Sequence, residues 1–138
     1  MSAEIEAARH WLVKARNDLL TPDNNLRAKK IPLDAVCFHC QQAAEKLLKA
    51  YLVAKGQAYP ISHDLPLILE RVLRLQPEAE RLREVLALLM PYAVEIRYPD
   101  EGRMPSRRDA EEARDAADQI LNWLKGAMSE LFKHHRGI

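Results

Sequence analysis

The sequence predicts an all-α protein, an antiparallel up-and-down four-helix bundle with one short additional helix. Apolar residues recur at three- and four-residue steps along most of the chain, which is the period of a helix buried on one side. No segment alternates apolar and polar residues convincingly over the length of a strand, and 138 residues include only four glycines. A chain of this length is expected to form one domain, residues 1–138, with its core at about 5–130.

The first helix is expected to run from about Ala3 to about Leu20. Its buried side repeats at helical spacing: Ile5, Ala8, Leu12, Ala15 and Leu19. The letters TPDNN follow, and Pro22 with two asparagines favours a turn that ends the helix.

Prolines and a glycine mark the ends of the second and third helices. The second is expected to begin near Pro32, a good first-turn residue, and to end before Gly56, a good C-terminal cap. The third follows the letters ISHDLP. Because Pro66 has no amide hydrogen to donate, it belongs in the first turn, which places His63 or Asp64 at the cap.

The fourth helix is expected to begin after Pro77 and to end near Arg97, because Pro99 disfavours helical geometry at Tyr98. Pro91 falls roughly opposite the apolar stripe, so we expect a kink there that leaves the ring unburied. The stripe consists of Leu82, Val85, Leu86, Leu89, Ala93 and Ile96.

The fifth helix starts at a capping-box-like sequence, SRRD at 106–109, and is expected to run to about Phe132. Residues 133–138 are basic and are expected to form a flexible tail. The buried stripe of this helix is expected to be Ala113, Ala117, Ile120, Leu124, Met128 and Leu131.

Composition limits the classes of function. A net charge of +1 argues against binding nucleic acid through bulk electrostatics, although a local basic patch stays open. No apolar run reaches the length of a membrane span, and MSAEIEAARHW carries acidic residues where a signal peptide needs an apolar region. We therefore expect a cytoplasmic protein without membrane contact.

The letters CFHC at 37–40 suggest a zinc site, because Cys and His are the usual zinc ligands. On a helix, however, Cys37 and Cys40 share the apolar face, while His39 points at least a quarter-turn away. The chain has no second cysteine pair. The pattern therefore favours buried thiols that act as small hydrophobic side chains, and we expect no metal and no cofactor.

The second helix also carries two polar columns, Gln41 with Glu45, and Gln42 with Lys46 and Lys49. Four-residue spacing of this kind favours a solvated helix face. Gln41 and Glu45 nevertheless lie at the edge of the apolar stripe. A polar pair at that edge would face another helix, another subunit or a ligand.

Two further residues have both a structural and a functional interpretation. His63 stands beside a helix cap, which favours a structural role, but its imidazole also suits a ligand group or a general base. Arg97 either stabilises the end of its helix, paired with Asp100 or Glu101, or binds an anion in a cleft where Tyr98 offers a stacking ring. Spacing alone leaves both alternatives open.

Taken together, four segments resemble the HEPN domain family: WLVKARNDL, CFHCQQAAEKLLKAYLVAKG, SHDLPLIL and IRYPDEG. The resemblance covers about residues 5–130. It implies a four-helix up-and-down bundle with a short extra helix, commonly a homodimer. Many prokaryotic members of the family act with a minimal nucleotidyltransferase as a two-component, often toxin–antitoxin, pair.

Many HEPN members are metal-independent ribonucleases that use an arginine and, four to six residues later, a histidine. Arg97 matches that arginine by position, but the histidine is absent, because the next one along the chain is His134. The sequence resembles the non-catalytic RYPD branch of the family. The resemblance therefore implies a binding or regulatory protein rather than an enzyme.

The resulting hypothesis is a dimeric partner of a nucleotidyltransferase that binds nucleotide or RNA phosphate in a cleft near the dimer interface. The candidate binding residues are Arg97, Tyr98, Glu45, Lys46 and His63. One alternative is a ribonuclease with a diverged site. Its candidate catalytic residues are Arg97, Asp100, Glu101 and His63. A second alternative is a purely structural dimerisation scaffold.

Overall fold

The helix α2 forms the centre of the protein. The computed structural model describes residues 2–93 and 104–133, and every regular element within these ranges is helical, which confirms the all-α prediction. The α-helices are α1 Ala3–Asn25, α2 Leu33–Ala54, α3 Leu65–Leu73, α4 Arg83–Leu89 and α5 Arg107–Ala127. The 3-10 helices are η1 Pro77–Leu82, η2 Met90–Tyr92 and η3 Ser129–Phe132.

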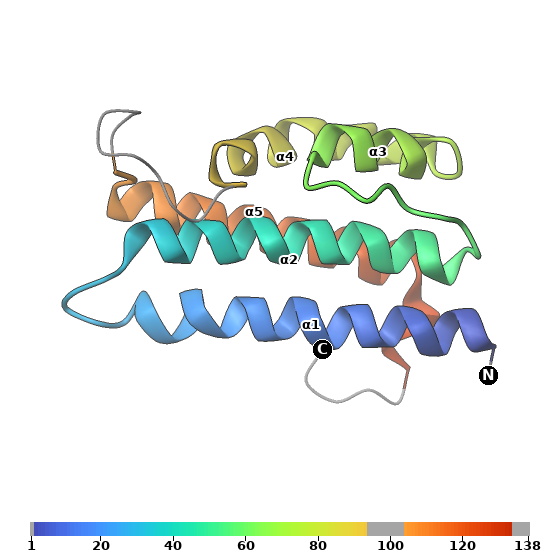
Figure 1. Ribbon diagram of the computed structural model, residues 1–138, viewed down its shortest axis with the longest axis horizontal. Coiled ribbons are helices and arrows are strands. Elements are labelled where there is room, and N and C mark those ends of the chain that lie inside the picture. The colour runs from blue at the N-terminus through green and yellow to red at the C-terminus, as the bar shows by residue number, and fades with distance from the viewer. Residues whose placement is uncertain (1, 94–103, 134–138) are drawn as a thin grey trace.

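The long elements alternate in direction around α2. Figure 1 shows α1 and α2 antiparallel and side by side, with α5 on another side of α2 and the α3–α4 pair along a further one. The segment between α2 and α3 runs back along the bundle, so α3 is parallel to α2 and is the short additional helix. None of the described helices combines the length and apolar character of a membrane-spanning segment.

The helix α1 continues beyond its predicted end. Ser2 caps its start by accepting a hydrogen bond from the Ile5 amide at 3.1 Å. Pro22, expected to end the helix, lies inside its last turn, with its ring buried, and the Leu26 amide still donates to the Pro22 carbonyl at 2.9 Å. A proline this close to the end removes a single backbone hydrogen bond, and burial of its ring offsets that loss.

The prediction of one continuous fourth helix is wrong. Instead of one kinked α-helix, the chain forms η1, a short α4 and η2, and α4 ends at Leu89 just before Pro91. Pro91 is exposed, as expected. The shift to 3-10 geometry on both sides of α4 shortens the regular helix to seven residues. The predicted end at Arg97 lies outside the described residues, as does the predicted tail from residue 134 onward.

Side-chain contacts attach η1 and its flank to the rest of the bundle. The Trp123 indole donates to Glu78 Oε1 at 2.8 Å, and this bond is the main cause of a lowered pKa of the Glu78 carboxyl. The Tyr51 hydroxyl donates to Gln76 Oε1 at 3.2 Å, while its ring lies 5.1 Å from that of Trp123. These contacts join α2, η1 and α5 at one end of the core.

The predicted caps are confirmed. Asp64 caps α3 by accepting from the Leu67 amide, and Ser106 with Asp109 forms a complete capping box at the start of α5. Gly56 follows α2 with φ at +69°, the left-handed conformation that favours glycine. The end of α5 is earlier than predicted: Met128 adopts φ −140° and ψ 62°, and the separate η3 follows it.

The predicted stripes form most of the core. All five residues predicted for α1 are buried, as are Leu82, Leu86 and Leu89 of the fourth segment. In α5, Ala113, Ala117, Ile120 and Leu124 are buried, whereas Met128 is half-buried. The helix α2 has buried residues on almost every side because α1, α5 and α3 surround it.

Arg9 of α1 holds the C-terminal end of the described chain. Its guanidinium donates to the carbonyl oxygens of Leu131 at 3.2 Å, Glu130 at 3.0 Å and Lys133 at 3.0 Å. The side chain is almost fully buried, so these carbonyls replace the water that a guanidinium would otherwise bind. The contact therefore fixes η3 against α1.

We expect Arg9→Met to lower the free energy of unfolding by about 2–3 kcal/mol, because several carbonyl groups lose a charged donor. Arg9→Lys is expected to be nearly as unstable as Arg9→Met, because an ammonium lacks the guanidinium fork. Urea denaturation measures both. Arg16→Met, on the exposed side of the same helix, is the control. Equal losses in the Arg9 and Arg16 variants would contradict the role of Arg9.

Candidate functional site

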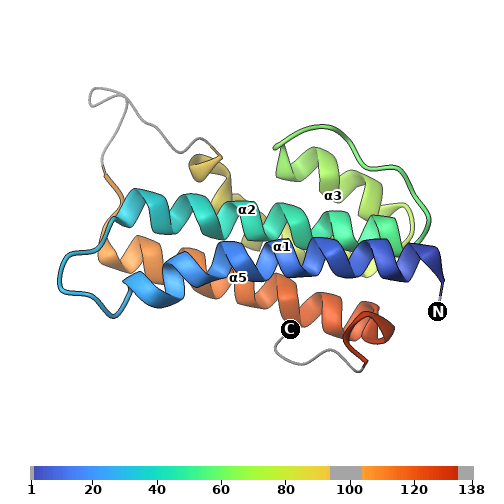
Figure 2. The same ribbon diagram turned by 60° about the horizontal axis from the view of Figure 1, so that its bottom comes forward.

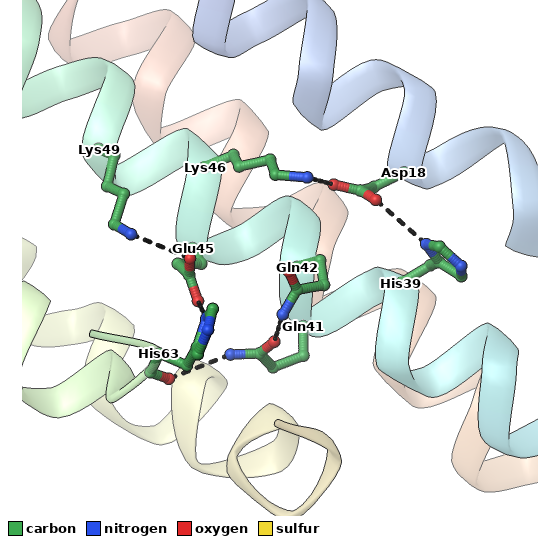
Figure 3. Close-up of polar contacts among 8 residues, drawn as sticks. All are labelled: Asp18, His39, Gln41, Gln42, Glu45, Lys46, Lys49 and His63. Carbon is green, nitrogen blue, oxygen red and sulfur yellow. Dashed lines mark hydrogen bonds and ion pairs between the residues drawn. The ribbon is translucent and has the colours of Figure 1, made fainter. Parts of the chain in front are cut away.

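A band of polar side chains crosses α2 from α1 to the segment before α3. We call it the polar belt, and Figure 3 shows its members. They are Asp18, His39, Gln41, Gln42, Glu45, Lys46, Lys49 and His63. Six of the eight belong to α2, so the regular rise of one helix sets their spacing.

The first cluster in the belt is centred on Asp18 of α1. Its Oδ1 lies 3.1 Å from Nδ1 of His39, and its Oδ2 accepts a hydrogen bond from Nζ of Lys46. One carboxylate therefore bridges two side chains that lie seven residues apart on α2. The His39 and Lys46 side chains keep 29% and 21% of their surface exposed, against 11% for Asp18. The donors thus lie nearer the solvent than the acceptor.

The second cluster is centred on Glu45 of α2, whose side chain is only 4% exposed. Its Oε2 accepts from Nζ of Lys49 at 3.0 Å, and its Oε1 lies 2.7 Å from Nδ1 of His63. The Lys49 ammonium also lies 5.7 Å from the Trp11 ring centre and 5.3 Å from that of Tyr59. These two rings meet edge to face at 5.2 Å. The cluster thus joins α1, α2 and the segment before α3.

Two glutamines extend the second cluster along α2. Gln41 is fully buried and donates from Nε2 to the His63 carbonyl oxygen at 3.2 Å. Its Oε1 accepts from Nε2 of Gln42 at 2.6 Å. Both the backbone and the ring of His63 are therefore held by α2, although its imidazole stays largely exposed.

Carboxylate and ammonium groups are balanced within each cluster of the belt. Each cluster contains one carboxylate, one ammonium and one imidazole. With neutral imidazoles, the charges of Asp18 and Lys46 cancel, and so do those of Glu45 and Lys49.

The structure corrects one prediction about these residues. The solvated face proposed for Gln41, Glu45 and Lys49 is wrong, because all three are buried. The alternative, a polar pair facing another part of the protein, is the one observed, since Glu45 and Gln41 both contact His63. These side chains lie at the margin of the stripe, where the chain before α3 covers them.

The candidate binding residues fall into two groups. Glu45 and His63 are in direct contact, whereas the neighbouring Lys46 points to the other side of α2 and binds Asp18. Arg97 and Tyr98 lie outside the described residues. So do Asp100 and Glu101, which belong to the ribonuclease alternative together with Arg97 and His63. The described residues therefore include three of the five predicted binding residues, Glu45, Lys46 and His63, and only Glu45 and His63 contact each other.

Sequence reasoning missed Asp18 and His39. Asp18 directly precedes Leu19 of the α1 stripe and is almost fully buried, so an acidic residue at the edge of an apolar stripe was the available indication. Its partner was not visible in the sequence, because His39 lies 21 residues away on another helix.

The buried-thiol interpretation of Cys37 and Cys40 is supported. Both side chains are fully buried in the hydrophobic core. Burial raises the pKa of the Cys40 thiol from its ordinary 9.0 to about 12. Within residues 2–93 and 104–133, no three His, Cys, Asp or Glu side chains are arranged to hold a metal ion.

Comparison with protein families identifies the class. The model of the HEPN domain matches residues 8–127, which is most of the chain and includes the whole polar belt. The protein belongs to the HEPN domain family. This result agrees with the resemblance found in the four sequence segments.

A solved structure supports the same fold. The chain is similar to TT1696 from Thermus thermophilus, whose crystal structure superimposes with a TM-score of 0.69. The two sequences are 33% identical over 86% of this chain and 96% of the other. A search of curated proteins gave no significant match.

We expect neither cysteine to react with Ellman's reagent at pH 8 in the native protein, because burial blocks access and keeps the Cys40 thiol protonated. Both should react once urea unfolds the chain. Stability should also fall as pH rises from 9 towards 12, because the unfolded thiol ionises there while the folded Cys40 thiol does not. Rapid labelling of the native protein would contradict the buried-thiol assignment.

The buried Glu45–Lys49 pair makes a separate prediction. Glu45→Leu alone leaves the Lys49 ammonium buried without its carboxylate, and we expect a loss of about 3–5 kcal/mol in the free energy of unfolding. The double variant Glu45→Leu/Lys49→Met removes both charges and should regain most of that loss. Urea denaturation of the single and double variants decides this. Additive losses would show that the two charges are not coupled.

Proposed function

We propose that this HEPN-family protein is a binding and regulatory module rather than an enzyme. Its polar belt contributes to a site for the phosphate of a nucleotide or RNA, near the interface of a homodimer. Arg97 supplies a further phosphate contact and Tyr98 a stacking ring. A minimal nucleotidyltransferase is the partner protein, in a two-component system of the toxin–antitoxin type.

The observation that carries the proposal is the order of burial within the belt. The carboxylates of Asp18 and Glu45 are largely covered, whereas the imidazoles of His39 and His63 and the Lys46 ammonium retain access to solvent. An approaching anion therefore meets donor groups first. Phosphate oxygens accept hydrogen bonds from such donors, and charged donors bind them most strongly.

Neighbouring aromatic rings suit a nucleotide better than inorganic phosphate. Trp11 and Tyr59 are half-buried at one end of the belt, and the Lys14 ammonium lies 5.3 Å from the Trp11 ring centre. Bases of any sequence stack on aromatic rings, which needs no specific readout. The Lys49 ammonium, 5.7 Å from the Trp11 ring centre and 5.3 Å from that of Tyr59, places these rings beside the Glu45 cluster of the belt.

The partner assignment rests on family membership. Many prokaryotic HEPN members act with a minimal nucleotidyltransferase, and the model of the HEPN domain matches residues 8–127 of this chain. A neighbouring reading frame with a Gly-Ser pair followed by Asp-x-Asp would identify the nucleotidyltransferase. Its absence from the gene's surroundings would count against that part of the proposal.

Calorimetric titration with ATP tests the binding site. We expect wild-type protein to bind, and Arg97→Ala and Lys46→Ala each to weaken binding by about tenfold, the loss of one charged contact of about 1.4 kcal/mol. Lys29→Ala, exposed and remote from the belt, is the control.

Two outcomes would overturn the site. Absence of ATP binding by the wild type excludes it, and equal binding by the wild-type and Arg97→Ala proteins excludes the assigned role of Arg97. Thermal unfolding of the Arg97→Met variant distinguishes ligand binding by Arg97 from the structural role expected of a dimerisation scaffold. If Arg97 has a structural role, the substitution lowers the melting temperature of the ligand-free protein. If Arg97 binds the ligand, the substitution leaves that melting temperature nearly unchanged.

A further inference from the structure

We propose that the valley between α1 and α5 binds a basic, amphipathic segment of a partner protein. This surface is separate from the polar belt and goes beyond phosphate binding, because it assigns a protein contact to a different pair of helices. Figure 2 shows α1 and α5 each running along α2, and few residues of these two helices approach each other directly. Both pack on α2, which forms the floor of the valley between them.

Arginine contacts join the two sides of the valley at its ends. At one end, Arg9 reaches from α1 to the carbonyl oxygens around η3. At the other, Arg114 of α5 donates to Asp23 of α1 at 2.7 Å, and Arg107 donates to the Leu26 carbonyl at 2.6 Å. These contacts hold α1 and α5 at a fixed separation, so the valley is part of the folded structure.

An apolar pocket of about 130 Å³ lies between these arginine contacts. Its apolar lining comes from three helices and consists of Leu12, Ala15, Leu19, Leu20, Leu47 and Leu121. Leu20, which lines the pocket, is 47% exposed and is therefore accessible to an approaching side chain. The pocket is smaller than the roughly 300–1,000 Å³ of sites for small organic ligands. Its size suits one or two apolar side chains.

A second, more open hollow adjoins the pocket on the other side of the Arg114–Asp23 contact. It measures about 430 Å³ and its charged lining consists of Asp23, Glu111, Arg114, Asp115 and Asp118. Four carboxylates therefore face one arginine, and that arginine is already bound to Asp23 and lies 3.7 Å from Asp118. The hollow retains a net negative charge.

This charge selects among the occupants. A second copy related by a two-fold axis through the hollow would bring two acidic hollows together, and like charges in an interface cost several kcal/mol. A nucleic acid would be repelled for the same reason. A partner helix or strand can place an apolar side chain in the pocket and a lysine or arginine in the acidic hollow.

Two synthetic helical peptides test the surface. One carries leucines along one face and lysines elsewhere, and the other replaces each lysine with glutamate. We expect the lysine peptide to bind the full-length protein, as measured by fluorescence anisotropy, and the glutamate peptide to bind at least about tenfold more weakly. Leu20→Asp, which places a charge at the mouth of the pocket, should abolish binding of both.

A charge exchange distinguishes the valley from non-specific attraction. Glu111→Lys/Asp115→Lys should weaken the lysine peptide and strengthen the glutamate peptide, each by about tenfold. The matched control Glu4→Lys/Glu84→Lys changes the same net charge at exposed positions elsewhere and should leave both affinities unaltered. Circular dichroism checks that each variant is folded.

The results that overturn the proposal are distinct from those that overturn phosphate binding. Equal peptide affinities in the exchange and control variants exclude the acidic hollow as the determinant. Dissociation of a wild-type dimer by Leu20→Asp in sedimentation would show that a second copy covers the valley instead. ATP binding at the polar belt should be the same in all of these variants. The ATP titration therefore tests phosphate binding independently of peptide binding in the valley.

Discussion

The burial of charged groups along α2 is the constraint on which the rest of the structure depends. Because other helices surround α2, its carboxylate and ammonium groups must find partners inside the protein or lose several kcal/mol each in hydration. Glu45 meets this requirement with Lys49 and with His63, which fixes the chain between α2 and α3. Lys46 meets it with Asp18 of α1. The contacts that stabilise the helix packing therefore also create the polar belt that Figure 3 draws across α2.

The two sides of the bundle differ in chemistry because they use charge differently. On the belt side, the carboxylates of Asp18 and Glu45 are largely covered, whereas the side chains of His39, Lys46 and His63 lie nearer the solvent. Along the α1–α5 valley, carboxylates line the opening and an arginine is held between them. A protein with a net charge of +1 thus has two surfaces that differ in which charged groups reach the solvent. The net charge of the chain does not reveal this difference between the two surfaces.

Features set by local chemistry could be predicted from the sequence. The caps at Asp64 and Ser106 depend on a few neighbouring atoms, and helical stripes follow from the period of the helix. The errors occurred where packing competes with local preference. Pro22 stays helical because its ring is buried, and the fourth segment departs from α geometry where side chains attach it to α5. Glu45 and His63 entered the candidate site through the family motif, but the pairing of Asp18 with His39 depends on tertiary structure.

The clamp formed by Arg9 has a consequence for the order in which the protein folds during synthesis. Arg9 leaves the ribosome early, whereas the carbonyl groups that it binds belong to residues 130, 131 and 133. The α1–α2 hairpin can form from residues already made, but its arginine stays hydrated until residues 130–133 have emerged. The last side-chain contacts of α1 therefore form only when η3 docks, and a truncation before residue 130 leaves the Arg9 guanidinium in water at the surface of the bundle.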